Sequence, residues 1–373
     1  MKEINYITSD KWWDTDVDVL PLLCKSYPVN VFCYTQTFKG CVQKYKNKSC
    51  SNAKTFKDWK MPFRTKNPLA YILNFWYFIK TLSVGRRDDK INYYVYGSHS
   101  FFMYLFLVLF SSRNTIICFH NYIEHSGKNN SLKKRFIRKY KYFHFHSEVE
   151  YFQFKKDFPN KVSFFSPMPP KDFGKPHNVM PNDKKRKKTF LFFGLIKQYK
   201  RLDLFIKAAK AFDKENCLFL IVGNCDHWEK YRETVKPCAN VKSDIRFIEN
   251  DEIADVFAKT DVLILPYDDA TQSGPSLIAI NYGIPIIASN LQTFRSLIKD
   301  GINGYLFEKG EVDDLIKQIR RFLDLSEQEC VDMHNNQLKL KQKFLNEKSF
   351  TSYFTQFLSL IHISEPTRQA EIS

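Results

Sequence analysis

Two groups of residues in the second half of the chain have types and spacing suited to binding phosphate. Lys197 and Lys200 follow the apolar run TFLFFGLI, so two cations lie in a loop just after a predicted strand. Further on, Ser273-Gly274-Pro275 opens a predicted helix with a polar cap, a residue that permits close approach and a proline suited to the first turn. The N–H groups at such a helix start bind anions. The two groups predict a site that binds phosphate.

His120 is the candidate catalytic residue of the first half. It follows the apolar run TIICF, at the end of a predicted strand. Ligands of open α/β sheets bind beyond the carboxyl ends of the strands. We therefore expect His120 to face a ligand, although a lone histidine is more often a structural core residue.

The sequence shows no ligand spacing typical of a metal site. The nine cysteines form no C-x-x-C pair, and the first 20 residues do not resemble a secretory signal, so the cysteines are interpreted as reduced thiols. Asp14, Asp16 and Asp18 begin a predicted helix, where acids stabilise the helix dipole. We expect neither a metal nor a resident cofactor.

Predicted strands and helices alternate along both halves, which is typical of an α/β fold with a parallel sheet. In the first half a polar, lysine-rich loop is expected from about 37 to 66. The expected strands lie at 4–8, 29–36, 91–97, 115–121, 189–196, 217–224, 261–267, 284–289 and 303–307. The expected helices lie at 14–27, 68–82, 101–112, 202–212, 252–260, 272–283 and 311–325. The apolar helix at 101–112 is too short to span a bilayer and is expected to be buried.

Length and composition predict two domains joined by a linker. A chain of 373 residues with 44% hydrophobic residues is long enough for two cores. We expect an N-terminal Rossmann-like domain at 1–170, a proline-rich linker at 171–188 and a C-terminal Rossmann-like domain at 189–357. The last sixteen residues, LSLIHISEPTRQAEIS at 358–373, resemble a translated sequencing adapter and are expected to be non-native, without function and poorly ordered.

Nearly all of the net charge of +17 belongs to the first half of the chain. Residues 1–180 hold 29 Lys and Arg against 13 Asp and Glu, whereas the remainder is almost balanced. The densest basic segment is SLKKRFIRKYKYF at 131–143, where helical spacing would put Phe136, Tyr140 and Phe143 on one side. Such a helix suits an anionic membrane surface, with a solvated surface helix as the alternative. The membrane-facing candidates are Lys133, Lys134, Arg135 and Arg138.

Residues 189–325 resemble the retaining, family-4 type of glycosyltransferases with the GT-B fold. Four segments carry the resemblance in order: FFGLIKQYKRLDLFIKAA, LFLIVGN, DVFAKTDVLILPYDDATQSGPSLIAINYGIPIIAS and DGINGYLFEKGEVDDLIKQI. In the first half, CFHNYIEHSG is similar to the family's strand-end histidine segment.

The resemblance implies two Rossmann-like, doubly wound domains facing a cleft and a nucleotide-diphosphate sugar as donor. It assigns Lys197 and Lys200 to the diphosphate and His120 to the donor sugar. The implied donor-binding residues are Gly194, Gly223, Asp268, Asp269, Gln272, Ser273, Gly274 and Pro275. The implied protein is a metal-independent transferase at the cytoplasmic face of the plasma membrane that acts on a glycan or lipid-linked acceptor in cell-surface polysaccharide synthesis.

Two positions depart from the family pattern. The family carries two glutamates eight residues apart, and alignment through Gly283 and Pro285 puts Ala270 and Ile278 there. A branch of the family resembles this chain in carrying Q-S-G instead, which leaves ribose recognition unassigned. The alternatives are therefore an inactive partner subunit, a nucleotide-sugar epimerase of the same fold, and a basic nucleic-acid-binding protein. No helix-turn-helix, zinc-finger or RNP pattern supports the last, so no nucleic-acid partner is expected.

Overall fold

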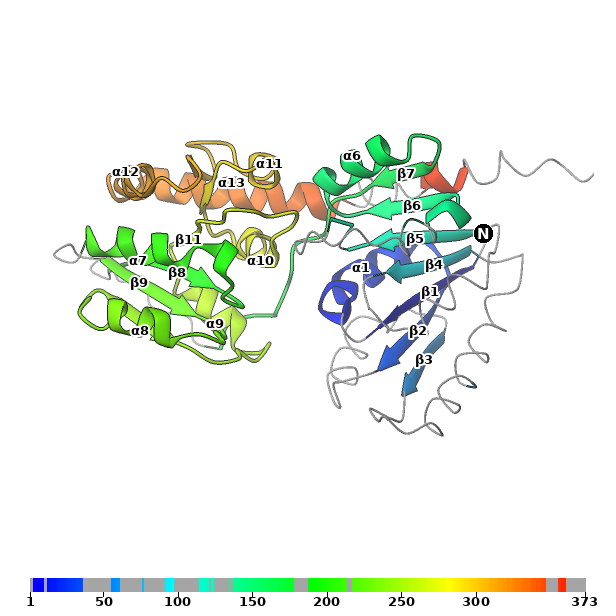
Figure 1. Ribbon diagram of the computed structural model, residues 1–373, viewed down its shortest axis with the longest axis horizontal. Coiled ribbons are helices and arrows are strands. Elements are labelled where there is room, and N and C mark those ends of the chain that lie inside the picture. Colours follow the sequence, from blue (N-terminus) through cyan, green and yellow to red (C-terminus); the bar gives the residue numbers. More distant parts are fainter. Residues whose placement is uncertain are drawn as a thin grey trace, which may run out of the picture. The chain divides into compact units, whose positions relative to one another are not determined.

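The computed structural model describes two compact units, each an α/β domain (Figure 1). The first unit comprises residues 1–168 together with 345–373, and the second comprises residues 169–344. The described residues are 3–9, 12–35, 55–60, 76, 91–96, 114–120, 122–123, 134, 137–177, 187–212, 217–346 and 355–359. The expected helices at 68–82 (apart from Trp76) and 101–112 lie outside them, as do Lys133 and Arg135.

The first unit is built on a seven-stranded sheet in which every pair is parallel. The strand order is β3-β2-β1-β4-β5-β6-β7. The strands are β1 (Ile4–Ser9), β2 (Val29–Thr35), β3 (Thr55–Lys60), β4 (Ile91–Tyr96), β5 (Thr115–Phe119), β6 (Tyr142–Phe145) and β7 (Val162–Phe165). The described helices are α1 (Trp13–Ser26) and α6 (Glu148–Asp157). Since β1 lies between β2 and β4, the chain reverses direction across the sheet there, as in doubly wound folds.

Both faces of this sheet are covered, which explains its nearly continuous apolar strands. Alternate residues of β1 lie in different cores: Tyr6 packs with α1, and Ile7 packs with the aromatic core around Phe154 of α6. Segment 355–359 is helical, and Phe357 and Leu358 are buried in the α1-side core.

The second unit has a six-stranded parallel sheet of order β10-β9-β8-β11-β12-β13. The strands are β8 (Lys188–Phe193), β9 (Cys217–Val222), β10 (Val241–Asp244), β11 (Val262–Leu265), β12 (Ile286–Ser289) and β13 (Gly304–Phe307). The helices are η2 (Gln198–Lys200), α7 (Leu202–Lys210), α8 (Glu229–Val235), α9 (Ile253–Ala258), α10 (Gly274–Tyr282), α11 (Gln292–Arg295), α12 (Val312–Leu323) and α13 (Glu327–Leu345).

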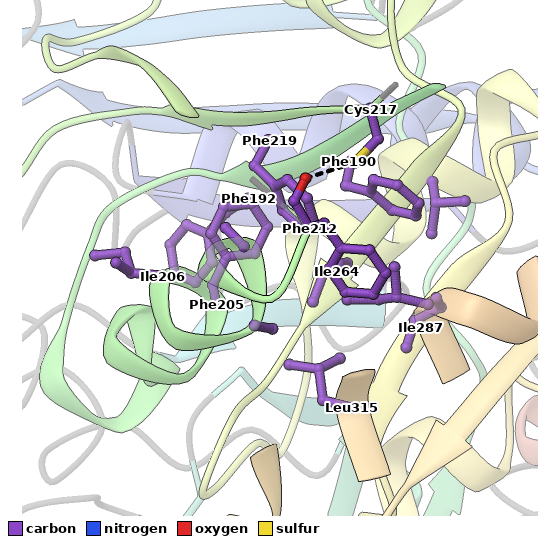
Figure 2. Close-up of a cluster of buried hydrophobic side chains, with 14 of the residues drawn as sticks. Phe190, Phe192, Phe205, Ile206, Phe212, Cys217, Phe219, Ile264, Ile287 and Leu315 are labelled. Atoms are coloured by element: carbon purple, nitrogen blue, oxygen red, sulfur yellow. Dashed lines mark hydrogen bonds between the residues drawn. The ribbon is translucent and has the colours of Figure 1, made fainter. Parts of the chain in front are cut away.

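Two cores hold this sheet between its helices. One core joins α7 and α12 to the sheet through stacked and edge-on phenylalanines, with Phe190 against Phe219 and Phe192 against Phe205 (Figure 2). The opposite core joins α9 and α10 to the sheet. The helices are therefore fixed on both faces, so the loops at the carboxyl ends of the strands start from a rigid scaffold.

The unit boundaries differ from the sequence expectation. Residues 169–177, expected to fall mostly in the linker, belong to the second unit: Lys171 donates its backbone N–H to Leu277 O at 3.2 Å, and Phe173 donates to Tyr282 Oη at 3.1 Å. At the other end, Leu358 is 8% exposed in the first unit's core, contrary to the expected disorder of the tail. Residues 360–373 lie outside the described part of the chain.

Three elements correct the sequence expectation in the first unit. The lysine-rich loop contains the edge strand β3, whose sequence TFKDWK is mostly polar and has no apolar run. The expected basic helix ends by Lys139, and its last residues begin β6. Asp16, expected only to stabilise a helix dipole, lies near the start of α1 but is buried, and its carboxylate accepts hydrogen bonds from Tyr6 and Thr8.

No helix within the described ranges is long and apolar enough to cross a membrane.

Candidate functional site

Gly194, Lys200 and Pro275 meet at the carboxyl edge of the second sheet. Gly194 follows β8 with φ 102°, a left-handed conformation that favours glycine. A methyl group placed on Gly194 would lie 3.5 Å from Nζ of Lys200 and 3.6 Å from Cγ of Pro275. The structure thus brings together, within one unit, three of the residues expected to bind the donor.

Lys200 is the buried cation of this group. Lys200 is the last residue of the short helix η2 and is 8% exposed. Its Nζ lies 5.4 Å from the centre of the Tyr267 ring. Burial lowers the pKa of Lys200 to about 8. The ammonium group is charged at neutral pH, but its burial has already removed most of its hydration. An anion that binds it therefore displaces little water.

Lys197 is held differently. Its ammonium group forms an ion pair with Asp226 at 2.9 Å, and both side chains are about half exposed. The ion pair lowers the pKa of Asp226. Solvent screens a pair this exposed, so Lys197 can exchange Asp226 for a phosphate oxygen at little cost.

The start of α10 has the predicted capping geometry. Ser273 is extended, and its hydroxyl accepts the backbone N–H of Ser276 at 3.3 Å, while Pro275 occupies the first turn. A methyl group on Gly274 would contact nothing within 4 Å among the described residues, so the approach to the helix start is open there.

Asp268 is engaged by Arg201, a residue that the sequence analysis did not single out. The Arg201 guanidinium group bonds both oxygens of Asp268, at 3.0 and 3.2 Å, and both oxygens of Asp203, each at 2.9 Å. Arg201 also has φ 51°, a left-handed conformation that costs a non-glycine residue about 1–2 kcal/mol. Asp268 therefore joins the loop after β11 to the loop that carries Lys200. The adjacent Lys-Arg pair in the sequence gave no sign of this bridge.

The other expected donor-binding residues have mixed surroundings. Gly223 has φ 139°, and a methyl group there would lie 2.2 Å from the carbonyl oxygen of Gly194, so its absent side chain allows two strand ends to touch. Asp269 is exposed. Nε2 of Gln272 is buried and has no hydrogen-bond acceptor among the described residues. A buried amide donor of this kind favours a ligand oxygen beside it.

Ala270 and Ile278 occupy the positions of the missing glutamates. They are 9% and 4% exposed and belong to the core between α10 and the sheet. A carboxylate at Ile278 would be buried in apolar surroundings, so this chain uses the position for packing.

His120, expected at the donor sugar, lies in a buried cluster of the first unit. Its ring stacks on Trp12 with centroids 4.4 Å apart and lies 5.4 Å from the ring of His146. Burial lowers the pKa of His146 to about 4 and raises the pKa of the Cys118 thiol. The side chains of Cys118, His120 and His146 could together hold a metal ion, contrary to the expectation from sequence spacing.

The missed signal is a pair of two-residue spacings, Cys118-Phe-His120 and His144-Phe-His146. Each spacing repeats with the period of a strand, so both side chains of a pair face the same side of the sheet. Two adjacent parallel strands then bring the pairs together. Metal motifs within one loop or helix do not resemble this arrangement.

Two of the three aromatic residues expected on one side of the basic segment are buried, and the third, Phe136, lies outside the described residues. Tyr140 is 3% exposed and Phe143 is fully buried in the core beneath α6, which corrects the expected amphipathic membrane helix. Lys134 and Arg138 are exposed, as are their neighbours Lys139 and Lys141. The exposed side chains in the described part of this segment are therefore positively charged.

Part of the chain is similar to a known protein family. Residues 187–325 match the family described as Glycosyl transferases group 1. An uncharacterized 41.2 kDa protein in the cps region of Klebsiella pneumoniae is 27% identical over 138 residues, which is 36% of this chain and 36% of that relative. The chain thus matches about a third of that protein's length.

Similarity to solved structures extends over nearly the whole chain. Sucrose-phosphate synthase from Thermosynechococcus elongatus has a TM-score of 0.70 at 13% identity, covering 98% of this chain and 100% of that one. HepE from Anabaena in complex with UDP has a TM-score of 0.69 at 13% identity, covering 96% and 100%. The α/β fold with two Rossmann-like domains expected from the sequence is confirmed as GT-B.

Proposed function

We propose that this chain, whose residues 187–325 match the group 1 glycosyl transferases, is a retaining glycosyltransferase. It moves a sugar from a nucleoside-diphosphate sugar to a glycan or lipid-linked acceptor in cell-surface polysaccharide synthesis. The observation that carries the proposal is the convergence of Lys200, Gly194 and the start of α10 at one sheet edge. The bound UDP of the structurally similar HepE supports a nucleotide donor.

Each part of this edge has a role in the proposed reaction. Lys200 and the first N–H groups of α10 hold the diphosphate, and Lys197 leaves Asp226 to join them. As the glycosidic bond breaks, negative charge grows on the diphosphate, and these preorganised cations and dipoles stabilise it. Gln272 offers its buried Nε2 to a donor oxygen. The protein supplies this charge from side chains and backbone, so we expect no divalent cation at the diphosphate.

Retention follows a route that needs no pair of catalytic carboxylates. The leaving diphosphate accepts the proton of the acceptor hydroxyl while the new bond forms on the same face of the sugar. This differs from a retaining glycosidase, which places two carboxyl groups about 5–5.5 Å apart. The anomeric configuration of the product, read by NMR, tests this part of the proposal.

Turnover on a panel of nucleotide sugars tests the activity. We expect diphosphate release with one donor, dependent on a lipid-linked or glycan acceptor and retained in EDTA. Lys200→Ala should lower the rate about 10²–10³-fold, as loss of one charge-stabilising contact does elsewhere. Lys210→Ala, an exposed lysine at the end of α7, is the matched control and should turn over normally. A Lys200→Ala variant as fast as the control would remove Lys200 from the site.

His120 is proposed to act on the sugar side of the reaction. We expect His120→Ala to reduce transfer while nucleotide binding, which belongs to the second unit, stays nearly unchanged. A variant that instead fails to fold would show that His120 serves the core.

The first unit is proposed to hold the protein on anionic lipid at the cytoplasmic face of the membrane. The exposed side chains of Lys134, Arg138, Lys139 and Lys141 support this, although the neighbouring aromatic residues are buried. Attraction here is electrostatic, at about 1 kcal/mol per basic residue near the surface.

A further inference from the structure

Three metal-ligating side chains meet at the carboxyl edge of the first sheet. Cys118 lies in β5, His120 directly follows that strand, and His146 directly follows β6. The two strands are parallel with Phe119 opposite Phe145, so the next residues along, His120 and His146, are neighbours. One ligand atom from each of the three residues lies within 4.8 Å of the others, and all three side chains are buried.

We propose that Cys118, His120 and His146 bind one zinc ion. One sulfur and two imidazole nitrogens form a ligand set that suits zinc, whereas magnesium and calcium require oxygen ligands. Zinc–ligand bonds of about 2.0–2.3 Å place tetrahedral ligand atoms about 3.3–3.6 Å apart. The ligand atoms, which lie within 4.8 Å of one another, therefore have to approach by up to about 1.5 Å, and the fourth position is left for water or a substrate oxygen.

The surroundings of the two histidines suit metal binding. Nδ1 of His146 lies 3.0 Å from the backbone carbonyl oxygen of Ser166, and because a carbonyl only accepts, Nδ1 donates. The lone pair of the His146 ring is then on Nε2. Metal-ligating histidines typically have such a carbonyl partner, which fixes the tautomer and the ring orientation. The ring of His120 is restricted by its stacking on Trp12, with only 9° between the planes.

A chain of hydrogen bonds leads to the sulfur. Tyr93 is hydrogen-bonded to Cys118 and to Nδ1 of His144, and Nε2 of His144 lies 2.7 Å from the Ser166 hydroxyl. Both ring nitrogens of His144 are thus engaged, which leaves His144 out of the ligand set. With the Ser166 hydroxyl donating to His144 and His144 donating to Tyr93, the Tyr93 proton is directed at Cys118. Zinc requires the Cys118 thiolate, so the thiol proton is released to solvent on binding, and the Tyr93 hydroxyl is then placed to donate to the sulfur.

The zinc site shares no residue with the diphosphate site, and His120 is the one residue that it shares with the proposed transfer reaction. Every zinc ligand belongs to the first unit, and every residue that carries the diphosphate proposal belongs to the second. Failure of one proposal therefore leaves the other testable in the same purified protein.

Metal content of the full-length chain is the test. Protein from zinc-supplemented medium, desalted and analysed by plasma mass spectrometry, should carry about one zinc per chain. Cys118→Ser and His146→Asn should lose it. Cys33→Ser is the matched control, because Cys33 is also fully buried in the first sheet but lies outside the cluster, and it should keep its zinc. Stoichiometric zinc in Cys118→Ser would overturn the proposal.

Cobalt substitution tests the wild-type chain directly, without reliance on variants that could misfold. After zinc is removed by a chelator, added Co²⁺ should produce a thiolate-to-cobalt charge-transfer band and the visible bands of a tetrahedral site. Zinc-free wild-type protein whose cobalt spectrum lacks the thiolate band would contradict the proposal.

Tyr93→Phe tests the hydrogen-bond support. Loss of a partner that orients a ligand typically weakens metal binding 10–100-fold, and we expect this loss in competition with a chromogenic chelator. An unchanged zinc affinity would contradict the role of Tyr93. His120→Ala connects the two proposals: if it keeps its full zinc while losing transfer, His120 is not a ligand.

Discussion

Lys200 combines two properties that the sequence could not show together. The spacing after the predicted strand identified it as a phosphate-binding candidate, but only the packing against Tyr267 and Gly194 buries it. Burial lowers the pKa of Lys200 to about 8, whereas the side chain of Lys197 is about half exposed and pairs with Asp226. The two lysines are equivalent in the sequence and differ in solvation.

Nucleotide affinity should therefore depend on pH through Lys200. Because its pKa is lowered, Lys200 in the folded protein loses its proton at a lower pH than an ordinary lysine. The charged form that binds the diphosphate is therefore depleted above about pH 8. We expect nucleoside diphosphate binding, measured by calorimetry, to weaken about tenfold per pH unit beyond that point.

Lys200→Arg provides the control for this pH dependence, since an arginine stays charged throughout. Its affinity, even if lower at pH 7, should be flat from pH 7 to 9. A wild-type affinity that is also flat over this range would contradict the assignment of Lys200 to the diphosphate.

At the scale of elements, five strands of the second unit (β8, β9, β11, β12 and β13) and the helices α7, α9, α10 and α12 could be predicted in order, because most of these strands are apolar runs between polar loops. Helices α8, α11 and α13 were not predicted. The boundaries of β9, α7 and α12 agree with expectation to within two residues, and β8 ends three residues earlier than expected. The edge strands β3 and β10 could not be predicted, because they are short and polar, and their place depends on a neighbouring strand. The Cys118, His120 and His146 cluster escaped for the same reason: it depends on the register between β5 and β6.

Arg201 shows how one connecting residue positions an element. Its left-handed backbone turns the chain from η2 into α7, and its side chain holds Asp203 and Asp268. We expect Arg201→Ala to be less stable than Arg201→Gly by about 1 kcal/mol in urea unfolding, because only glycine accepts this backbone conformation without strain. An alanine variant at least as stable as the glycine variant would contradict this account of the turn. Both variants should bind nucleotide more weakly than wild type, since both release Asp268.

At the scale of the whole molecule, the charge asymmetry belongs to the first unit, whereas the proposed nucleotide site belongs to the second. The sequence predicted the asymmetry by simple counting. It could not predict that Tyr140 and Phe143 are buried, because their helical spacing hid the change from helix to strand at β6. Electrostatic attraction without aromatic insertion should be weaker and more sensitive to salt.

Vesicle binding tests this account of the surface. Binding should rise with the phosphatidylglycerol content and fall as salt shortens the screening length to about 8 Å near physiological ionic strength. Neutralising Lys134 and Arg138 together should weaken binding by about 2 kcal/mol, and turnover on a short soluble acceptor should not change. Indifference to lipid charge, or tighter binding to duplex DNA under the same conditions, would contradict membrane docking.

The most direct test of the central claim is a calorimetric titration of the chain with the common nucleoside diphosphates at pH 7. The account predicts that at least one of them binds, that Lys200→Ala weakens it about 10–100-fold through loss of a charged hydrogen bond, and that Lys210→Ala binds as wild type. Absence of binding by every nucleoside diphosphate, or equal affinity in the Lys200→Ala and Lys210→Ala variants, would contradict a donor site at the start of α10.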